Sequence, residues 1–513
     1  MTGTGFISTT IPYVNARPHL GHALEFVETD AYARFMRTHL DDVFFLTGSD
    51  ENALKNVLAA ETAGIATADL VARNAASFQD LLARLGCAPD HFVRTSVDPL
   101  HLAGATEIWQ RMAAAGDIYS RAYEGLYCVG CEQFYEPGEL VDGACPEHLT
   151  APEPVREQNY FFRLSRYQDD LLKCLESGEL VIHPETRRNE VISFVRAGLQ
   201  DISISRSAHR ARGWGIPVPG DDSQVMYVWI DALTNYTNAL GWTAGDPRYE
   251  RFWAGAARRV HVMGKGVIRF HAVYWPAMLL SAGLPLPTDL VVHGYITAGG
   301  RKIGKSLGNA VDPVALVERF GARAVRYALL ATFAPFGDGD ITEERIVAAY
   351  NTDLANGLGN LVNRVTSMVG RYRGSVVPAG DRAGGLGPAV ATAASGFDQA
   401  MAAFDHRAAV QHLTTLVGRA NSYVDEHAPW HLAKQPSEAD RLDTCLLHTA
   451  AAVRAAAVLL RPVLPDAAAE ILAALGQPAD LRLAADDWLG AGMAGARVEK
   501  PAAIFPRIDA PAT

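Results

Sequence analysis

The sequence predicts an α/β fold with a parallel sheet, split by a small insertion and followed by a C-terminal bundle of helices. Three observations predict it. The first 115 residues alternate short β-rich runs with helical stretches, which is typical of parallel βαβ units. Residues 120–154 are rich in Gly, Cys, Glu and Pro and have no sustained period. From Glu343 onward, apolar residues recur every three or four positions.

The elements of the α/β part follow from these patterns. Phe6–Pro12 and Val43–Thr47 are predicted strands, with a helix over Ala23–Met36 between them. After the insertion we expect three further strands, over Val225–Ile230, Arg259–Met263 and Asp289–Thr297. One helix is expected near Arg269–Leu280.

The C-terminal part reads as helices. An amphipathic helix is predicted over Ile346–Met368, then a loop over Ala379–Pro388, and long helical segments near Ala389–Val424 and Asp440–Leu460. A single large α/β domain with added helices is the alternative. We expect boundaries that give the segments 1–115, 116–215, 216–342, 343–480 and 481–513.

Composition excludes several classes of protein. The chain has 513 residues, 49% of them apolar and 20% charged, so it can bury several cores and is not disordered. It has no run of 18 apolar residues, which predicts no membrane span, and its first 22 residues do not resemble a secretory signal. Six cysteines are too few for a disulfide scaffold, so we expect a cytoplasmic protein. The net charge of −11 argues at first sight against a nucleic-acid partner.

The insertion carries a candidate zinc site. Cys128 and Cys131 form one short pair, and Cys145 and His148 form another, which is the ligand number and spacing of a tetrahedral zinc knuckle. Four protein ligands leave no open position, so the site reads as structural. Two unrelated reduced pairs are the alternative. The remaining cysteines lack pair spacing and are expected to be buried.

Two histidines mark the start of the first helix. His19 and His22 are three residues apart, so both project from one face near a helix N-terminus, where backbone amides favour an anion. Gly21 would let a ligand approach the backbone. The histidines could therefore orient phosphates, although two solvated or capping histidines would give the same pattern.

A cationic loop lies between Gly299 and Asn309. Glycines surround Lys302, Lys305 and Ser306, which predicts a loop able to close on a triphosphate. A solvated turn is the alternative. The spelling from Gly299 to Ser306 also fits a Walker motif, but the breakers that follow argue against the helix a P-loop requires.

Together these motifs resemble the class I aminoacyl-tRNA synthetases, and specifically the methionyl-tRNA synthetase family. Pro18–His22 looks like the family's His-Ile-Gly-His signature, and Lys302–Ser306 looks like its Lys-Met-Ser-Lys-Ser loop. The zinc pairs, Asn159–Arg163 and Trp214–Pro219 fall in the family's order, so the resemblance runs from Phe6 to about Leu475. It implies a Rossmann-like catalytic domain split by a zinc-knuckle insertion, followed by a helical anticodon-binding domain.

The resemblance also implies a reaction and its residues. Methionine would be joined to the α-phosphate of ATP and then moved to the 3′ end of methionine tRNA. Mg²⁺ would share the phosphate charge with the implied catalytic and ATP-binding residues, which are His19, Gly21, His22, Lys302, Lys305 and Ser306. Asp50 would pair with the substrate ammonium. The implied pocket for the methionine side chain consists of Ile11, Tyr13, Trp229, Ala232, Leu233, Tyr236, Val267 and His271.

For tRNA, Asn360 and Arg364 are four residues apart and share a helix face. With Trp430 they match the family's anticodon-reading positions. A tRNA face can be local on an acidic chain, and two arginine clusters are candidates for it: Arg206, Arg210 and Arg212, and Arg364, Arg371 and Arg373. We expect a monomer, because little chain follows the helical bundle.

The sequence departs from the family pattern at a few site positions. Asn52 and Ala53 stand where the family usually has His-Gly, Gly266 stands where it usually has Asp, and Ile303 and Gly304 replace Met and Ser. Two alternatives therefore stay open at this point. One is a paralogue that activates an amino acid for transfer to a small molecule, and the other is a non-catalytic RNA-binding module.

Overall fold

The computed structural model describes residues 3–128, 133–135, 137–146, 149–298, 301–302, 311–483, 487–490 and 492–509. It divides into two compact units. The first consists of residues 1–29, 39–83 and 87–293, and the second of residues 30–38, 84–86 and 294–513.

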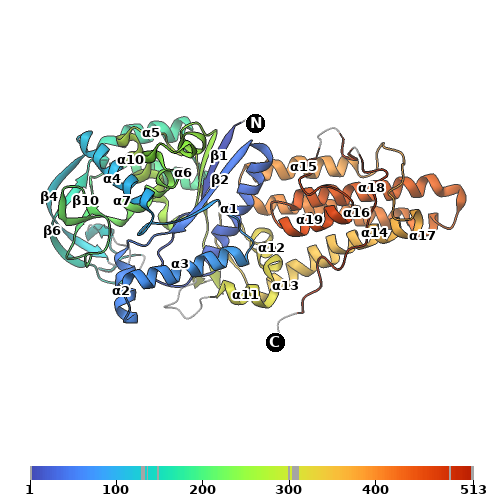
Figure 1. Cartoon of the computed structure of the whole chain (residues 1–513), viewed down its shortest axis with the longest axis horizontal. Coiled ribbons are helices and arrows are strands. Elements are labelled where there is room, and N and C mark those ends of the chain that lie inside the picture. Colours follow the sequence, from blue (N-terminus) through green and yellow to red (C-terminus); the bar gives the residue numbers. More distant parts are fainter. Residues whose placement is uncertain are drawn as a thin grey trace. The chain divides into compact units, whose positions relative to one another are not determined.

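A six-stranded parallel sheet forms the centre of the first unit, as predicted (Figure 1). Its order is β3 (His91–Arg94), β2 (Asp42–Ser49), β1 (Thr4–Ser8), β12 (Arg258–Gly264), β13 (Asp289–His293) and β7 (Val181–His183). Phe6 of β1 lies opposite Phe44 on one side and Arg259 on the other. Strand order reverses direction between β1 and β12, which is where ligands bind in open α/β sheets.

Helices connect the strands, and local sequence explains their ends. Asp98 caps α4 (Pro99–Ala114) by accepting from the amides of Leu100 and His101, and Gly64 ends α2 (Leu54–Ala63) at φ 66°. Other helices that precede residue 294 are α1 (Leu20–His39), α3 (Thr67–Arg84), α5 (Gln168–Ser177), α6 (Glu185–Arg196), α8 (Asn235–Asn238), α9 (Pro247–Tyr249) and α10 (Trp275–Ala282), with residues 30–38 of α1 and the last residue of α3 in the second unit.

Two antiparallel sheets lie in and just after the predicted insertion. One has the order β5 (Gln133–Tyr135), β4 (Ile118–Cys128), β6 (Glu153–Phe162) and β8 (Ile202–Ser203). The other has the order β10 (Pro217–Val218), β11 (Asp221–Met226) and β9 (Ser205–Ser207). The strand predicted over Val225–Ile230 is half wrong, because β11 ends at Met226 and α7 (Val228–Leu233) follows. That helix has only six residues and is almost fully buried, so its sequence shows no exposed polar face that would reveal a helical period.

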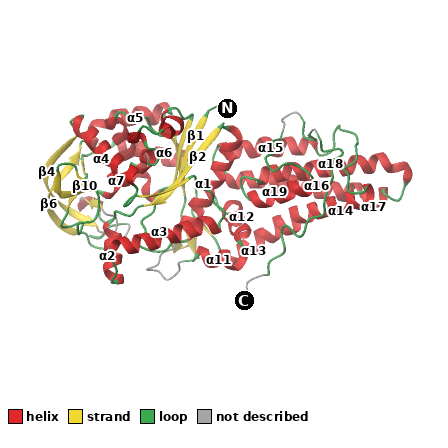
Figure 2. Ribbon diagram, in the orientation of Figure 1, coloured by secondary structure: helices red, strands yellow, loops and turns green. Residues whose placement is uncertain are grey.

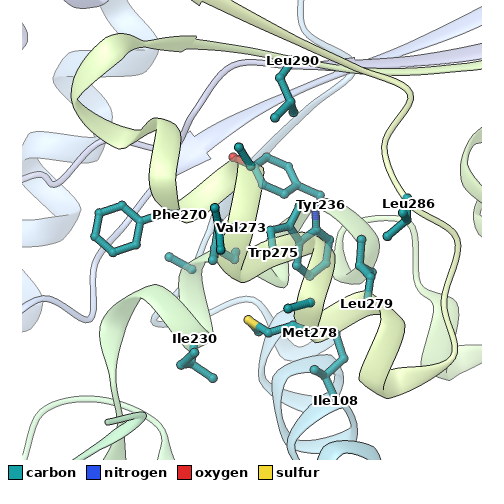
Figure 3. Close-up of a cluster of buried hydrophobic side chains, with 14 of the residues drawn as sticks. Ile108, Ile230, Tyr236, Phe270, Val273, Trp275, Met278, Leu279, Leu286 and Leu290 are labelled. Atoms are coloured by element: carbon teal, nitrogen blue, oxygen red, sulfur yellow. The ribbon is translucent and has the colours of Figure 1, made fainter. Parts of the chain in front are cut away.

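One aromatic-rich core lies beside the sheet. Figure 3 shows Tyr236, Val273 and Trp275 in one cluster with Met278 and Leu279. Tyr236 is 1% exposed and Trp275 is fully buried. Burial of such large rings supplies most of the stabilisation in a core. This core holds α7, α8 and α10 in place, and these helices carry several of the residues expected to bind substrate.

The second unit begins with a small sheet and continues almost entirely as helices (Figure 2). The sheet has the order β15 (Arg301–Lys302), β14 (Ile296–Ala298) and β16 (Gly339–Asp340). The single strand predicted over Asp289–Thr297 is therefore two strands. Gly294 separates them, and a Cβ on it would lie 2.0 Å from the carbonyl oxygen of Gly337.

The helices of this unit are α11 (Pro313–Phe320), α12 (Ala322–Thr332), α13 (Glu343–Ala349), the π-helical η8 (Tyr350–Gly359), α14 (Asn360–Arg373), α15 (Gly387–Ala402), α16 (His406–His427), α17 (Pro429–Leu432), α18 (Ala439–Leu460) and α19 (Pro465–Ala474). The helix predicted over Ile346–Met368 is confirmed as the continuous run from α13 to α14. The one predicted near Ala389–Val424 is two helices, because Phe404 adopts φ 59° between them.

Helix α18 is the centre of the bundle. Among the described residues, the stretch Pro436–Leu460 is long and apolar enough to cross a membrane by length and composition alone, with a mean hydropathy of 1.4. However, 83% of that window is buried, against α14, α15, α16 and α19. A helix at the centre of a bundle is apolar on all sides, so it has the same composition as a membrane span. Counting uninterrupted apolar runs in the sequence did not detect this stretch.

Candidate active site

The carboxyl ends of β1 and β2 bring two predicted substrate residues together. Tyr13, after β1, pairs as a parallel bridge with Asp50, after β2. The amide of Asp50 donates to the carbonyl oxygen of Pro12 at 2.9 Å. Asp50 is only 1% exposed. A carboxylate is thus fixed at the end of the sheet, at the edge where the strand order reverses.

The two histidines of the first motif fold onto the N-terminus of α1. Nδ1 of His22 accepts from the amide of His19 at 3.1 Å, and Nδ1 of His19 accepts from the amide of Gly21 at 3.1 Å. The rings stack with centroids 3.8 Å apart. Because both Nδ1 atoms accept, each neutral ring carries its proton on Nε2. Both histidines accept from backbone amides at the helix end through Nδ1, and their role in orienting phosphates stays a prediction.

Gly21 is required by this arrangement. A Cβ at position 21 would lie 2.9 Å from Cε1 of His19. Any larger residue would therefore push the His19 ring off the helix end. The glycine serves the histidine contact directly, in addition to any approach of a ligand to the backbone.

A buried carboxylate that sequence reasoning missed anchors the loop after β1. Glu25 of α1 accepts from the amide and the hydroxyl of Thr10 at 2.7 and 2.5 Å. Its other oxygen lies 3.1 Å from Nε2 of His293 at the end of β13. Thr10 and His293 are 283 positions apart, so nothing local in the sequence indicates this link. It ties the loop that carries Ile11 and Tyr13 to the sheet.

The expected methionine pocket is assembled from α7, α8 and the turn after β12. The Trp229 ring stacks on Phe270 at 3.8 Å and meets Tyr13 edge-on at 6.1 Å. The expected residues that belong to the surrounding core or pack against it are Ile11, Tyr13, Trp229, Ala232, Leu233, Tyr236 and Val267. Aromatic walls suit a thioether, because sulfur gains from contact with rings.

His271 closes this group with a defined tautomer. Its Nδ1 lies 3.0 Å from the carbonyl oxygen of Val267 and must donate, so Nε2 accepts from the Tyr236 hydroxyl at 2.7 Å. Burial lowers the pKa of His271 to about 4. Burial also lowers the pKa of the neighbouring His261, whose Nδ1 lies 2.8 Å from Ser8 Oγ. Both rings are therefore neutral at physiological pH.

The cationic loop lies largely outside the described residues. Lys302 is the last residue of strand β15, in the second unit. Lys305, Ser306, Ile303 and Gly304 lie outside the described residues. Their roles stay predictions.

The expected anticodon residues lie together in the second unit. The Arg364 guanidinium lies 6.0 Å from the ring centroid of Trp430, within cation–π range. It also pairs with Asp425 at 2.5 Å and donates to Asn421 at 3.4 Å. Trp430 is 37% exposed, which is unusual for so large an apolar side chain. An exposed ring beside a fixed arginine is suited to stack and read an unpaired base.

The first arginine cluster does not form the surface patch that its spacing suggested. Arg206 is only 6% exposed and lies over the Tyr227 ring. Arg210 lies 3.6 Å from both Glu153 and Glu157. Carboxylates and burial neutralise this cluster, so it is a weak candidate for a tRNA contact.

Comparisons with known proteins fit this geometry. The model for class I tRNA synthetases (M) matches residues 5–153 and 139–366, and the model for the anticodon binding domain of methionyl tRNA ligase matches residues 377–512. The chain belongs to the methionyl-tRNA synthetase family. This confirms the resemblance, and with it the class of an aminoacyl-tRNA ligase.

Individual methionyl-tRNA synthetases align with nearly the whole chain. The methionine–tRNA ligase of Mycobacterium leprae is 45% identical, covering 98% of this chain and 94% of the relative. That of Mesorhizobium japonicum is 43% identical, covering 98% and 97%. The solved structure of the Mycobacterium tuberculosis methionyl-tRNA synthetase in complex with methionyl-adenylate superposes with a TM-score of 0.92 at 43% identity, covering 98% of this chain and all of that one.

One departure from the usual methionyl-tRNA synthetase pattern has a clear structural role. Nδ2 of Asn52 donates to Oδ2 of Asp231 at 2.8 Å, and Nε2 of His101 lies 2.7 Å from Oδ1 of the same carboxylate. Asp231 and His101 are fully buried. Asp231 is on α7 between Trp229 and Ala232, so Asn52 links the Asp50 loop to the helix of the expected methionine pocket. Gly266, in contrast, is exposed and nothing in the structure explains it.

Only two of the four expected zinc ligands lie among the described residues. Cys128 and Cys145 are 2% and 0% exposed and belong to one small cluster with Tyr135 and Leu140. Neither forms a disulfide. Cys131 and His148 lie outside the described residues, and among the residues that are described no group of three or more such side chains could hold a metal. The two described thiols are compatible with a knuckle, since they are reduced and buried in one small cluster.

Proposed function

We propose that this chain activates L-methionine with ATP to give methionyl-adenylate and transfers the methionyl group to the 3′ end of methionine tRNA. The observation that carries this proposal is the pairing of Asp50 with Tyr13 at the sheet edge, directly beside the Trp229–Phe270 stack. A buried carboxylate and an aromatic slot suit the two ends of methionine, its ammonium and its thioether.

The amino-acid end is bound by charge and shape. The Asp50 carboxylate pairs with the substrate ammonium, and such a charge-assisted hydrogen bond contributes roughly 1.5–3 kcal/mol. The thioether lies against Tyr13 and Trp229. Neutral His271 and Tyr236 form the floor of the pocket and carry no charge that would repel an apolar side chain.

Adenylate formation needs no protein nucleophile. The methionine carboxylate attacks the α-phosphorus, and pyrophosphate leaves. The Nε2 donors of His19 and His22 contact the phosphates at the N-terminus of α1, where backbone amides add to the positive potential. Lys302, Lys305 and Ser306 supply further donors from their loop, and bound Mg²⁺ would share the phosphate charge.

The acceptor is tRNA, recognised at its anticodon through Trp430, Arg364 and Asn360. Trp430 stacks on an unpaired base, while the Arg364 guanidinium and the Asn360 amide read base edges. The fixed pair of Arg364 with exposed Trp430 supports this, because a small-molecule paralogue has no use for such a face. The proposal also includes a monomeric, cytoplasmic enzyme that does not act at a membrane, and a structural zinc ion held by Cys128, Cys131, Cys145 and His148.

Amino-acid-dependent ATP–pyrophosphate exchange tests the activation step. Across a panel of the twenty amino acids we expect exchange with methionine alone. Lys305→Ala should slow it on the order of 10²–10³-fold, the usual cost of removing one positioned donor. Lys173→Ala, an exposed lysine on α5, is the matched control and should have no effect. Exchange driven by another amino acid would contradict the proposed substrate.

A further inference from the structure

A polar groove in the second unit runs along the helix that carries Asn360. Its volume is about 600 Å³, within the range of about 300–1,000 Å³ usual for ligand pockets. One wall is the face of η8 and α14 that bears Asn356, Asn360 and Asn363. The other wall is the C-terminal segment Lys500–Phe505. The groove therefore begins at a proposed anticodon-reading residue and ends at the C-terminal segment.

The three asparagines form one row. They are four and three residues apart, so they share a helix face. All three are exposed, and the described residues provide no hydrogen-bond partner for their side-chain amides. Asn363 and Arg364 are three and four residues after Asn360, so both are its neighbours one helical turn further along. The row thus continues the face of Arg364 and Trp430 toward the C-terminal segment.

The C-terminal segment is held rigidly against this helix. The side chain of Asn351 exchanges two hydrogen bonds with the backbone of Ile508, at 2.8 and 3.1 Å. Arg323 donates to the carbonyl oxygen of Ile504 at 2.7 Å, and Phe505 packs edge-on against Tyr350. Gly359 allows this approach, since a Cβ there would lie 3.3 Å from the Phe505 ring.

Lys500 stands at the opposite wall from the asparagines. The two residues before it are anchored, because the amides of Val498 and Glu499 donate to the carbonyl oxygens of Ser375 and Ala474 at 2.9 and 2.8 Å. Lys500 itself is exposed and has no ion pair among the described residues. A lysine on an anchored backbone, across the groove from a row of amides, suits the two parts of a nucleotide, its phosphate and its base edge.

We propose that this groove binds the unpaired nucleotide next to the base stacked on Trp430, with Lys500 contacting its phosphate and Asn363 reading its base. The proposal rests on the proposed function, in that the RNA is the anticodon loop of methionine tRNA. It adds the C-terminal segment as a functional wall of the reading site. Amides read base edges, whereas a lysine contact to phosphate is independent of sequence, so the two residues have separable signatures.

The test is the equilibrium affinity of the full chain for methionine tRNA between 50 and 200 mM salt. Lys500→Ala should lower the slope of log affinity against log salt by about 0.7, the contribution of one phosphate contact on a single strand. The affinity defect should therefore be about 2.6-fold larger at 50 mM than at 200 mM salt. Lys173→Ala is the matched loss of one charge and should leave the slope unchanged.

Asn363→Ala should leave the salt slope unchanged and lower affinity for methionine tRNA about 5- to 140-fold. For a tRNA with a substituted anticodon loop, Asn363→Ala should bind with the same affinity as the unmodified chain. Gln411→Ala, an exposed amide on α16 away from the groove, is the control. Unchanged ATP–pyrophosphate exchange would show that each variant is folded.

The outcomes separate this inference from the proposed function. If Trp430→Ala weakens tRNA binding while Lys500→Ala and Asn363→Ala bind as the unmodified chain does, the groove inference is wrong and the anticodon proposal stands. If all three variants bind tRNA normally, the anticodon proposal itself fails. A defect in Lys500→Ala with no change in salt slope would also overturn the phosphate contact.

Discussion

The hydroxyl of Tyr236 donates a 2.7 Å hydrogen bond to Nε2 of His271. The other ring nitrogen of His271 donates to Val267, so the ring is neutral and both of its nitrogens are used. Tyr236 and His271 are both 1% exposed. This pair fixes one side of the proposed methionine pocket without placing a charge in it.

The pair predicts a pH dependence of stability. The pKa of His271 is about 4 in the folded chain and rises to its usual 6.5 on unfolding. Below pH 6.5 the unfolded state binds a proton that the folded state does not, so stability falls as the pH drops from 6.5 to 4. The loss approaches about 3 kcal/mol. In denaturant unfolding at several pH values, His271→Gln should lose less stability over this window than the unmodified chain; parallel curves would contradict the assignment.

Gly21→Ala should impair the phosphate site without unfolding the chain. The added Cβ displaces the His19 ring from the end of α1. A displacement of about 1 Å can cost on the order of 10²-fold in rate. We expect exchange to slow by about this factor with little change in the KM for methionine. Gly64→Ala, where a Cβ meets no atom within 4 Å, should leave exchange unchanged although it strains a helix end.

Asn52→Ala should destabilise the chain and loosen the methionine pocket. It leaves one oxygen of the buried Asp231 carboxylate without its donor, at a cost of roughly 1.5–3 kcal/mol. The free energy of unfolding should fall by this amount, and the KM for methionine should rise. Exposed Asn363→Ala should leave both unchanged. An Asn52→Ala chain of unaltered stability would show that the Asn52–Asp231 bond contributes nothing.

Removal of a proposed zinc ligand should lower the metal content of the purified chain. We expect one zinc ion per unmodified chain and markedly less in Cys128→Ser, measured by elemental analysis. Cys87→Ser alters a buried thiol far from the insertion in sequence and should retain the ion. A full zinc ion in Cys128→Ser, or none in the unmodified chain, would exclude the four-ligand site.

The sequence predicted the α/β part well where local patterns decide structure. The strands near Phe6 and Val43 and the helix between them follow from short apolar runs and helical periodicity. Prediction failed where burial hides the period, as in α7, and where a strand is very short. Strand β7, Val181–His183, comes from the predicted insertion yet pairs with β13 of the main sheet. Three residues give too little pattern to recognise.

The site was predicted through motifs and missed wherever it depends on contacts distant in sequence. His19, Asp50 and Trp229 belong to recognisable spellings. The partners that hold them do not. Glu25 meets His293 across 268 positions, and Asn52 meets Asp231 across 179. No single-sequence pattern links such pairs, because only the folded chain brings them together.

The most direct measurement of the central claim is the rate at which the full chain attaches methionine to initiator and elongator methionine tRNA. We predict that both tRNAs are charged in an ATP-dependent reaction. We also predict that Trp430→Ala slows charging while methionine-dependent pyrophosphate exchange continues at the unmodified rate. Exchange with methionine but no methionyl-tRNA would contradict the account and favour transfer to a small-molecule acceptor.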